Sequence, residues 1–299
     1  MNKHLRLALI SLIASISLGA LLTFALSAES TKVGSIPTFT VCAIIAYGLN
    51  YLAFVPSYFA KTEHYFDLTG SITTITLIAF AILSSETKDA RSIFVTILVL
   101  IWATRLGSFL FLRAKETGGD SRFDQIIKYP LSFLSWWSLQ ALWVLANIAC
   151  ALAILTNKET KPFGAFATVG VILWIVGFGV EVTADQQKKN FRRNLSNQGD
   201  FIQSGLWAWS RHPNYFGEIL LWIGITIIAL PLLSGWSWVA LISPIFVVIL
   251  LTRISGIPIL ERRAKAKWGD DERYKNYIAE TPMLLPKPPR TKLRNESNM

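Results

Sequence analysis

Cysteine, histidine and charged side chains are all scarce in this chain of 299 residues. Its two cysteines, Cys42 and Cys150, each fall within an apolar run, and its three histidines are widely separated. This spacing offers neither a disulfide framework nor the ligand pattern of a zinc site, so we expect two buried free thiols and no metal. The Walker loop and the G-x-G-x-x-G motif are also missing, which argues against the soluble nucleotide-binding folds that carry these motifs.

Charged residues make up 16% of the chain, whereas a soluble domain carries about 25%. The apolar residues are gathered into blocks, and a block of about 20 residues is long enough to cross a bilayer as a helix. The runs lie at about 6–28, 36–59, 67–84, 91–112, 132–155, 163–183, 214–233 and 236–253. The sequence therefore predicts an all-α polytopic membrane protein with about eight transmembrane helices, within a range of seven to nine.

The first run resembles a secretory signal peptide, because it has a basic start and ends near the letters "ALSA". Its apolar stretch is about 20 residues long, however, and the apolar part of a signal peptide has about 7–15. We therefore expect a retained first span, with cleavage as the alternative.

Basic residues are distributed unevenly between the loops. With both termini placed in the cytoplasm, few of the 29 Lys and Arg residues fall outside. Those in external loops are Lys32, Lys88, Arg91, Lys158 and Lys161. This asymmetry follows the positive-inside rule, so the net charge of +10 reflects topology and not nucleic-acid binding. We expect one integral-membrane domain over residues 1–299, with a disordered tail at 290–299.

A charged stripe continues the sixth run in "GVEVTADQQKKNFRRN". Glu181, Asp185, Lys188 or Lys189, and Arg192 recur at three- and four-residue intervals, which places them on one helix face. An exposed helix with ion pairs between successive turns would give the same pattern. Glu181 fits that alternative poorly, since it directly follows a strongly apolar stretch.

Polar residues also stand where the seventh run begins, in "WSRHPNYFGEILLWIG". Pro213 suits the first turn of a helix, and Asn214 and Glu218 then share a face near its cytoplasmic end. Arg211 and His212 precede the helix, where free backbone N–H groups favour anions. An acid in a span normally faces a cavity or a partner, so Glu218 indicates either a ligand site or an ion pair with an arginine.

Two further regions carry unusual polar residues. After the last run, Glu261 is followed by an amphipathic segment with Tyr274 and Tyr277, which would also suit a helix lying in the membrane interface. Arg105 lies within the fourth run, too deep to reach the surface easily, and Asp67 begins the third. Together these residues indicate a site that grips a charged cofactor from the cytoplasm and admits a lipophilic substrate from the bilayer.

Three segments together resemble the steroid 5-alpha-reductase family, in particular its bacterial-type branch. They are "SGLWAWSRHPNYFGEILLWIGI", "TADQQKKNFR" upstream and "GIPILERRAKAKWGDDERYKNYIAETPMLLP" downstream. The similarity covers roughly residues 90–290, which implies variable N-terminal helices over 1–90 and a reductase-like core with the cofactor site over 91–289. Sterol reductases and isoprenylcysteine carboxyl methyltransferases are similar at a greater distance.

Members of this family are NADPH-dependent membrane enzymes that reduce an enone-type C=C bond. The resemblance therefore implies the same reaction on a lipophilic, steroid- or isoprenoid-like substrate. It also implies a place in the bacterial inner membrane, with the cofactor site facing the cytoplasm.

The resemblance assigns cofactor-binding roles to residues in each segment. Asp185, Lys189 and Arg192 match the helix that holds the adenosine and phosphate side of NADPH. Asn214 and Glu218 match an Asn-x-x-Gly-Glu motif beside the nicotinamide half. The other residues that we expect at the cofactor are Arg105, Arg211, His212, Tyr215, Glu261, Tyr274 and Tyr277.

The substrate half departs from the family. Trp102 stands near the position of the family's catalytic tyrosine, and Glu181 stands where the family has an amide. The candidates for a catalytic acid are therefore Asp67 and Glu218. An S-adenosylmethionine-dependent methyltransferase of the isoprenylcysteine or phospholipid type is the main alternative, because such enzymes share the R-H-P-x-Y pattern. A lipid or sterol binder without activity is a third.

Overall fold

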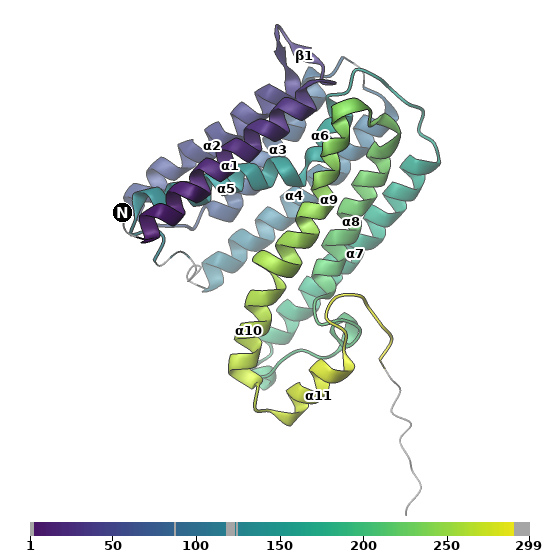
Figure 1. Ribbon diagram of the computed structural model, residues 1–299. Helices are drawn as coiled ribbons and strands as arrows, with labels where there is room; N and C mark the ends of the chain where they lie inside the picture. Colours follow the sequence, from purple (N-terminus) through teal and green to yellow (C-terminus); the bar gives the residue numbers. More distant parts are fainter. Residues whose placement is uncertain (1–2, 87, 118–122, 124, 290–299) are drawn as a thin grey trace, which may run out of the picture. The chain divides into compact units, whose positions relative to one another are not determined.

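The computed structural model describes residues 3–86, 88–117, 123 and 125–289, and the predicted disordered tail at 290–299 lies outside them. The regular elements of the described chain are helices apart from one small hairpin (Figure 1). Its α-helices are α1 (Lys3–Ser27), α2 (Thr38–Ala60), α3 (Phe66–Ser84), α4 (Ala90–Thr117), α5 (Pro130–Asn147), α6 (Ala149–Leu155), α7 (Ala165–Arg193), α8 (Pro213–Ala229), α9 (Ile242–Ile249), α10 (Ile257–Trp268) and α11 (Glu272–Glu280). Strands β1 (Lys32–Val33) and β2 (Ile36–Pro37) pair antiparallel. Short helical turns are η1 (Leu195–Asn197), η2 (Gly205–Ala208), η3 (Leu230–Leu232), η4 (Gly235–Leu241) and the π-helical η5 (Leu250–Ile254).

The prediction of a polytopic membrane protein is confirmed. Seven helical stretches in the described residues are long and apolar enough to span a membrane, or up to eight if the bent pair α5–α6 counts as one span. The predicted run at 132–155 corresponds to that pair, whose two helices meet at 57°. The last span is longer than predicted, because the helical path continues from Gly235 to Trp268.

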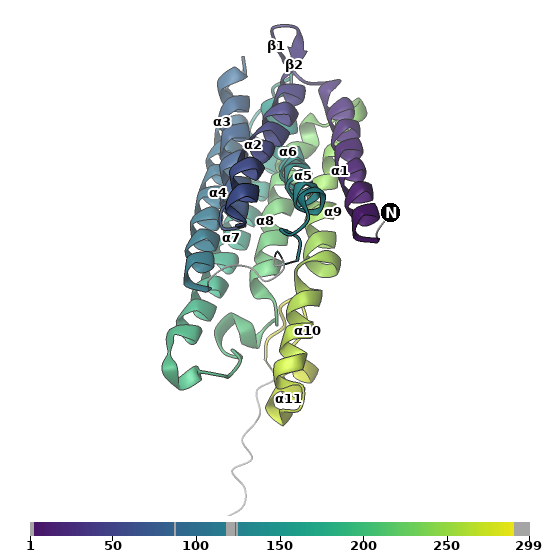
Figure 2. The ribbon, with the colours of Figure 1, turned by 90° about the vertical axis from the view of Figure 1, so that its left-hand side faces the viewer.

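The chain divides into two compact units. Unit 1 comprises Met1–Gly170 and Ile225–Phe246, and unit 2 comprises Val171–Gly224 and Val247–Met299. Within unit 1, α5 packs between α1 and α2, and α3 packs against both α2 and α4 (Figure 2). Helix α6 is apolar on every side and all seven of its residues are buried, which is typical of a helix enclosed by protein and not by lipid. Cys42 and Cys150 are buried free thiols, as predicted.

One charged side chain is fully enclosed in unit 1. Arg91, at the start of α4, is only 2% exposed. Its guanidinium donates from Nη1 to the carbonyl of Ile228 in the last turn of α8, and from Nη2 to the carbonyl of Pro162 at 2.8 Å. A cation at a helix C-terminus satisfies carbonyls that have no partner within the helix. Arg91 thus ties α4, the segment before α7 and the end of α8 together.

Replacing Arg91 by methionine should therefore destabilise the protein. The change removes two charge-assisted hydrogen bonds and leaves the carbonyl of the buried Ile228 without this donor, so we expect a loss of about 1–3 kcal/mol in a thermal melt of the detergent-purified protein. Lys88→Met is the matched control, because Lys88 is exposed a few residues earlier and its loss should change little. Equal melting of both variants would contradict this role of Arg91.

Unit 2 is organised by a close approach of α7 and α8. A Cβ atom added at Gly177 would lie 2.6 Å from both the carbonyl oxygen of Gly217 and the backbone nitrogen of Leu221. A Cβ at Gly217 would lie 2.5 Å from the carbonyl oxygen of Gly177 and 2.6 Å from the nitrogen of Glu181. The two backbones touch here because neither helix carries a side chain at the contact, which is a common way for membrane helices to associate.

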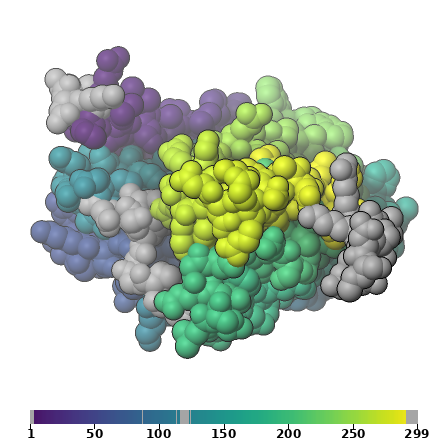
Figure 3. All heavy atoms as spheres, turned by 90° about the horizontal axis from the view of Figure 1, so that it is seen from below, coloured from purple at the N-terminus to yellow at the C-terminus, as the bar shows by residue number. Residues whose placement is uncertain are grey.

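The C-terminal part of unit 2 is held on the segment between α7 and α8 by hydrogen bonds that involve its backbone. The amide of Arg211 donates to the carbonyl of Pro282, and the amide of Lys287 donates to the carbonyl of Trp209, each at 2.9 Å. The Ser210 hydroxyl donates to the carbonyl of Leu284 at 2.9 Å. Viewed from below, the atoms of α10 and α11 lie against those of the segment that follows α7 (Figure 3).

Candidate functional site

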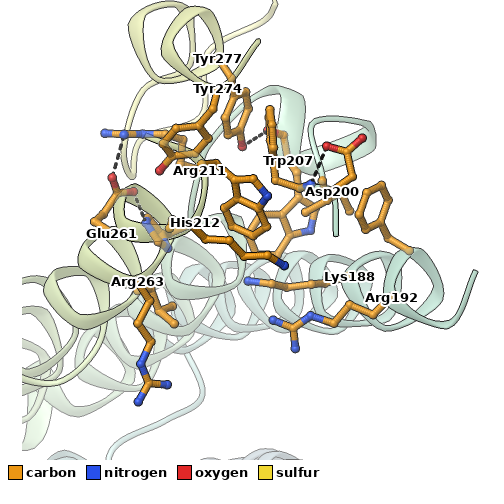
Figure 4. Close-up of a pocket in the computed structure, with 17 residues that line it drawn as sticks. Lys188, Arg192, Asp200, Trp207, Arg211, His212, Glu261, Arg263, Tyr274 and Tyr277 are labelled. Carbon is orange, nitrogen blue, oxygen red and sulfur yellow. Dashed lines mark hydrogen bonds and ion pairs between the residues drawn. The ribbon is translucent and has the colours of Figure 1, made fainter. Parts of the chain in front are cut away.

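A cavity of about 280 Å³ lies within unit 2. Four stretches of chain line it: the end of α7, the segment 200–212, α10 and α11 (Figure 4). Its charged and polar lining residues are Lys188, Arg192, Asp200, Arg211, His212, Glu261, Arg263, Lys267, Tyr274 and Tyr277, and its aromatic ones also include Phe201, Trp207 and Trp268. The lining is therefore rich in cations and in flat aromatic rings.

Helix α7 contributes Lys188 and Arg192, which are one helical turn apart and extend along the same side of the cavity (Figure 4). The stripe predicted from the sequence thus reaches the cavity at its C-terminal end. Lys189 is half-buried and does not line the cavity, although the resemblance selects it over Lys188. The reason is geometric, since the next residue on a helix points about 100° away.

The segment after α7 turns back so that Trp207 packs on the helix it has just left. Gly205 allows the turn because its φ is +60°, a conformation that favours glycine. The Gln187 side chain accepts a hydrogen bond from the Leu206 amide at 3.0 Å, and the Trp207 indole donates to the Ala184 carbonyl at 3.0 Å. The Lys188 ammonium then lies 4.2 Å from the centre of the Trp207 ring.

Glu261 of α10 holds the two basic residues that precede α8. One of its carboxylate oxygens accepts from Arg211 Nη1 at 2.9 Å, and the other is 2.8 Å from His212 Nε2. His212 is buried, and burial lowers its pKa despite the neighbouring carboxylate, which favours a neutral imidazole that donates its Nε2–H to Glu261. The imidazole also stacks on Tyr215, with ring centres 5.7 Å apart.

Helix α11 supplies the tyrosines. Tyr274 is buried, and the Tyr277 hydroxyl donates to the Trp207 carbonyl at 2.7 Å. Both rings lie against Phe201, with ring centres 5.2 Å and 5.7 Å from it. Burial raises the pKa of both tyrosines, so their hydroxyls stay protonated and act as hydrogen-bond donors.

Three predicted residues lie on or near the α7–α8 contact and do not line the cavity. The Asn214 side chain donates from Nδ2 to Asp185 Oδ1 at 3.2 Å, which links α8 to α7 one turn beyond the glycine contact. Asp185 is 9% exposed, and Glu218 is half-buried one turn further along α8. Glu181 is also buried, beside Gly217. The predicted polar face of α8 is thus directed at α7.

The remaining candidates belong to unit 1. Arg105 is half-buried on α4, with its guanidinium 5.2 Å from the centre of the Phe109 ring. Asp67 is half-buried at the start of α3 and borders a cavity of about 20 Å³ together with Glu63 and His64. Trp102 is buried in α4. The cofactor role expected of Arg105 and the catalytic role considered for Asp67 stay predictions.

Several lining residues were not singled out from the sequence: Lys188 as distinct from Lys189, Asp200, Phe201, Trp207, Arg263 and Lys267. Arg263 and Lys267 are four residues apart on α10, a spacing that places both on one helix face. That spacing was visible in the sequence, but it is equally typical of a basic helix lying on a membrane. Asp200 and Phe201 are in an irregular segment, where no periodicity identifies the residues that face inward.

The cavity is chemically suited to an anionic ligand with an aromatic part. Its cations outnumber its acids, and one of those acids, Glu261, already pairs with Arg211. Arginine and lysine clusters recognise phosphate groups, and the half-buried rings of Phe191, Trp268 and Tyr277 can contact a base. No group of three or more His, Cys, Asp and Glu residues within the described part of the chain could hold a metal ion.

The fold and the cavity define an integral membrane protein of seven or eight candidate spans with a cation-lined cavity in unit 2. The chain belongs to the DUF1295 family, described as proteins of unknown function, whose model matches residues 53–281.

Two curated proteins show a more distant similarity. One is the uncharacterized protein C594.04c of Schizosaccharomyces pombe, 26% identical over 188 residues, which cover 51% of this chain and 54% of that protein. The other is the mouse 3-oxo-5-alpha-steroid 4-dehydrogenase 1, 26% identical over 113 residues, which cover 34% of this chain and 42% of that protein. The chain thus spans about half the length of the curated relatives that it matches. No solved structure matches it.

Proposed function

We propose that this protein is an NADPH-dependent membrane oxidoreductase that reduces a C=C bond, of the enone type, in a lipophilic substrate. The observation that carries the proposal is the cavity of unit 2, with Lys188 and Arg192 on one side and aromatic rings around it. The partial similarity to a 3-oxo-5-alpha-steroid 4-dehydrogenase supports the reaction class. The substrate is expected to enter from the bilayer in which the spans lie.

The lining residues fit the adenosine half of NADPH. Ligand pockets usually measure about 300–1,000 Å³, so a cavity of about 280 Å³ suits one half of a dinucleotide and not the whole. Lys188, Arg192, Arg263 and Lys267 would hold phosphate groups, and the half-buried rings of Trp268 and Tyr277 would contact the base. When bound, the cofactor supplies a hydride, and the chain supplies position and charge.

The α7–α8 contact would position the other half of the cofactor. Asn214 and Glu218 lie along that contact, and the Asn214–Asp185 hydrogen bond fixes the orientation of the amide. Its Oδ1 atom is buried without a hydrogen-bond partner in the described chain, so it can accept a bond from a ligand carboxamide. The assignment of Asp67 or Glu218 as the catalytic acid stays a prediction.

The methyltransferase alternative fits the cavity less well. S-adenosylmethionine carries a sulfonium cation and no phosphate, whereas the lining of this cavity is predominantly cationic. Like charges in a partly buried site repel, so this cofactor should bind weakly.

Binding measurements on detergent-purified protein test the proposal. We expect NADPH to raise the melting temperature, NADH to raise it less and S-adenosylmethionine to leave it unchanged. Lys188→Ala and Arg192→Ala should each weaken NADPH binding by about 10- to 100-fold, because each removes a charge-assisted hydrogen bond worth about 1.5–3 kcal/mol.

Arg193→Ala is the matched control, because Arg193 is adjacent, exposed and not part of the lining. It should keep the affinity of the wild type. Stabilisation by S-adenosylmethionine alone would rule out the reductase, and equal affinities of the Arg192 and Arg193 variants would place the cofactor elsewhere.

A further inference from the structure

The span formed by α5 and α6 is broken although residues 131–155 contain neither proline nor glycine. The two helices meet at 57° across Ile148. A sharp bend without those residues commonly marks the insertion of a side chain or a water molecule into the helical hydrogen bonds. Here the Ser243 hydroxyl donates to the backbone carbonyl of Asn147, the last residue before the break. Polar groups therefore enter the middle of this span.

The side chain of Asn147 is the most unusual group at the break. It is 1% exposed, and neither its Oδ1 nor its Nδ2 atom has a hydrogen-bond partner among the described residues. An amide without partners is costly anywhere in a protein, and more so in a bilayer, where water is excluded. A leucine would fill a similar volume without this cost. The amide therefore indicates a partner that is not among the described residues.

Other buried polar side chains lie next to Ser243, which contacts the backbone at the break. Cys150, Thr226 and Ser243 are at most 8% exposed and come from α6, α8 and α9. The Cys150 thiol donates to the carbonyl of Ala240 at 3.1 Å and also contacts the hydroxyls of Thr226 and Ser243. In membrane proteins, broken helices and buried polar residues of this kind commonly form ligand sites.

We propose that Asn147 binds an O–H group at the α5–α6 break, supplied by an internal water molecule or by a lipophilic alcohol. An O–H group donates to Oδ1 and accepts from Nδ2, so it satisfies both ends of the amide, whereas a carbonyl oxygen satisfies only Nδ2. The site shares no residue with the proposed cofactor cavity, because its residues all belong to unit 1 and those of the cavity all belong to unit 2. It therefore does not depend on the identity of the cofactor.

Melting of an Asn147→Leu variant of the full-length, detergent-purified protein tests the proposal. If an O–H group occupies the site, the melting temperature should fall by roughly 2–8 °C, because the variant loses hydrogen bonds that the amide makes. Gln140→Leu is the matched control in the same helix, since Gln140 is buried and its Nε2 donates to the Phe66 carbonyl at 2.7 Å. Both variants should melt below the wild type. The proposal is overturned if the Asn147→Leu variant melts at or above the wild type and cholesterol does not stabilise the wild type either.

Cholesterol and its parent hydrocarbon cholestane, each added in mixed micelles, distinguish the two sources. Stabilisation of the wild type by cholesterol alone, lost in Asn147→Leu, assigns the O–H group to a lipophilic alcohol. A lowered melting temperature of the variant, without stabilisation of the wild type by cholesterol, assigns the O–H group to water.

If the leucine variant does not fold, Asn147→Ser tests the proposal in its place, because serine keeps only part of the hydrogen bonding. It should melt below the wild type, and an equal or higher melting temperature without a cholesterol effect contradicts the proposal.

Discussion

Gly217→Ala and Gly177→Ala should each lower the stability of the protein sharply, although alanine is the better helix former. The added methyl group would lie 2.5–2.6 Å from backbone atoms of the facing helix, and backbone atoms cannot rotate away as a side chain can. The helices must separate instead, and overpacking of this kind costs about 1–3 kcal/mol or more. A thermal melt of each variant measures the effect, and the loss should exceed that of any other single methyl group added to α7 or α8.

The same change at Gly179 is the matched control. Gly179 lies two residues further along α7, and a Cβ atom there would have no neighbour within 4 Å. Gly179→Ala should therefore stabilise the protein slightly, by up to about 1 kcal/mol, through its helix propensity. The separation of α7 and α8 should also disturb the Asn214–Asp185 hydrogen bond and weaken NADPH binding. Similar melting of the Gly177 and Gly179 variants would show that the helices do not touch at this contact.

Glu261→Ala is expected to have the second large effect. The carboxylate is 29% exposed, and its partners Arg211 and His212 are 17% and 6% exposed, so solvent screens these contacts only in part. Hydrogen bonds to charged groups contribute about 1.5–3 kcal/mol each, and partial exposure reduces this, so we expect a loss of about 2–3 kcal/mol in total. The melting temperature should fall by several degrees.

Glu272→Ala removes an acid of a different kind and serves as the control. Glu272 pairs with Lys275 on the surface of α11 and its side chain is 78% exposed. Exposed pairs contribute about 0–1 kcal/mol, so this variant should melt close to the wild type. A Glu261 variant as stable as the Glu272 variant would mean that the contacts of Glu261 do not hold α10 to the start of α8.

The membrane helices were predictable because their signal lies in long apolar runs. Pro213 begins α8 as its missing N–H suggests, and the charged continuation of α7 is a single helix to Arg193. The break between α5 and α6 was not predicted, since no proline or glycine marks it and both halves are equally apolar. The break is contacted by Ser243, which lies 96 residues away in the chain, and no local pattern can indicate such a contact.

The candidate site was predictable in part for a related reason. Arg192, Arg211, His212, Glu261, Tyr274 and Tyr277 line the cavity, and each was selected from the sequence. Their polarity near an apolar run was the signal. Two of the contacts that hold residues 281–287 on the segment before α8 are between backbone atoms, which leave no trace in residue identity, and the others come from the single hydroxyl of Ser210. Whether Lys188 or Lys189 faces the cavity depends on the rotation of α7 about its own axis. That rotation cannot be read from the sequence until the element that faces α7 is known.

The most direct test of the proposed cofactor site uses half of the cofactor as a probe. Adenosine 2′,5′-bisphosphate carries the phosphate that distinguishes NADPH from NADH, and its size suits a cavity of about 280 Å³. In equilibrium titrations of the purified protein, it should bind more tightly than adenosine 5′-monophosphate and be displaced by NADPH. Binding should weaken with salt, as expected for a cation-lined site. Equal affinity for the two nucleotides, or no binding of either, would contradict the assignment of this cavity to NADPH.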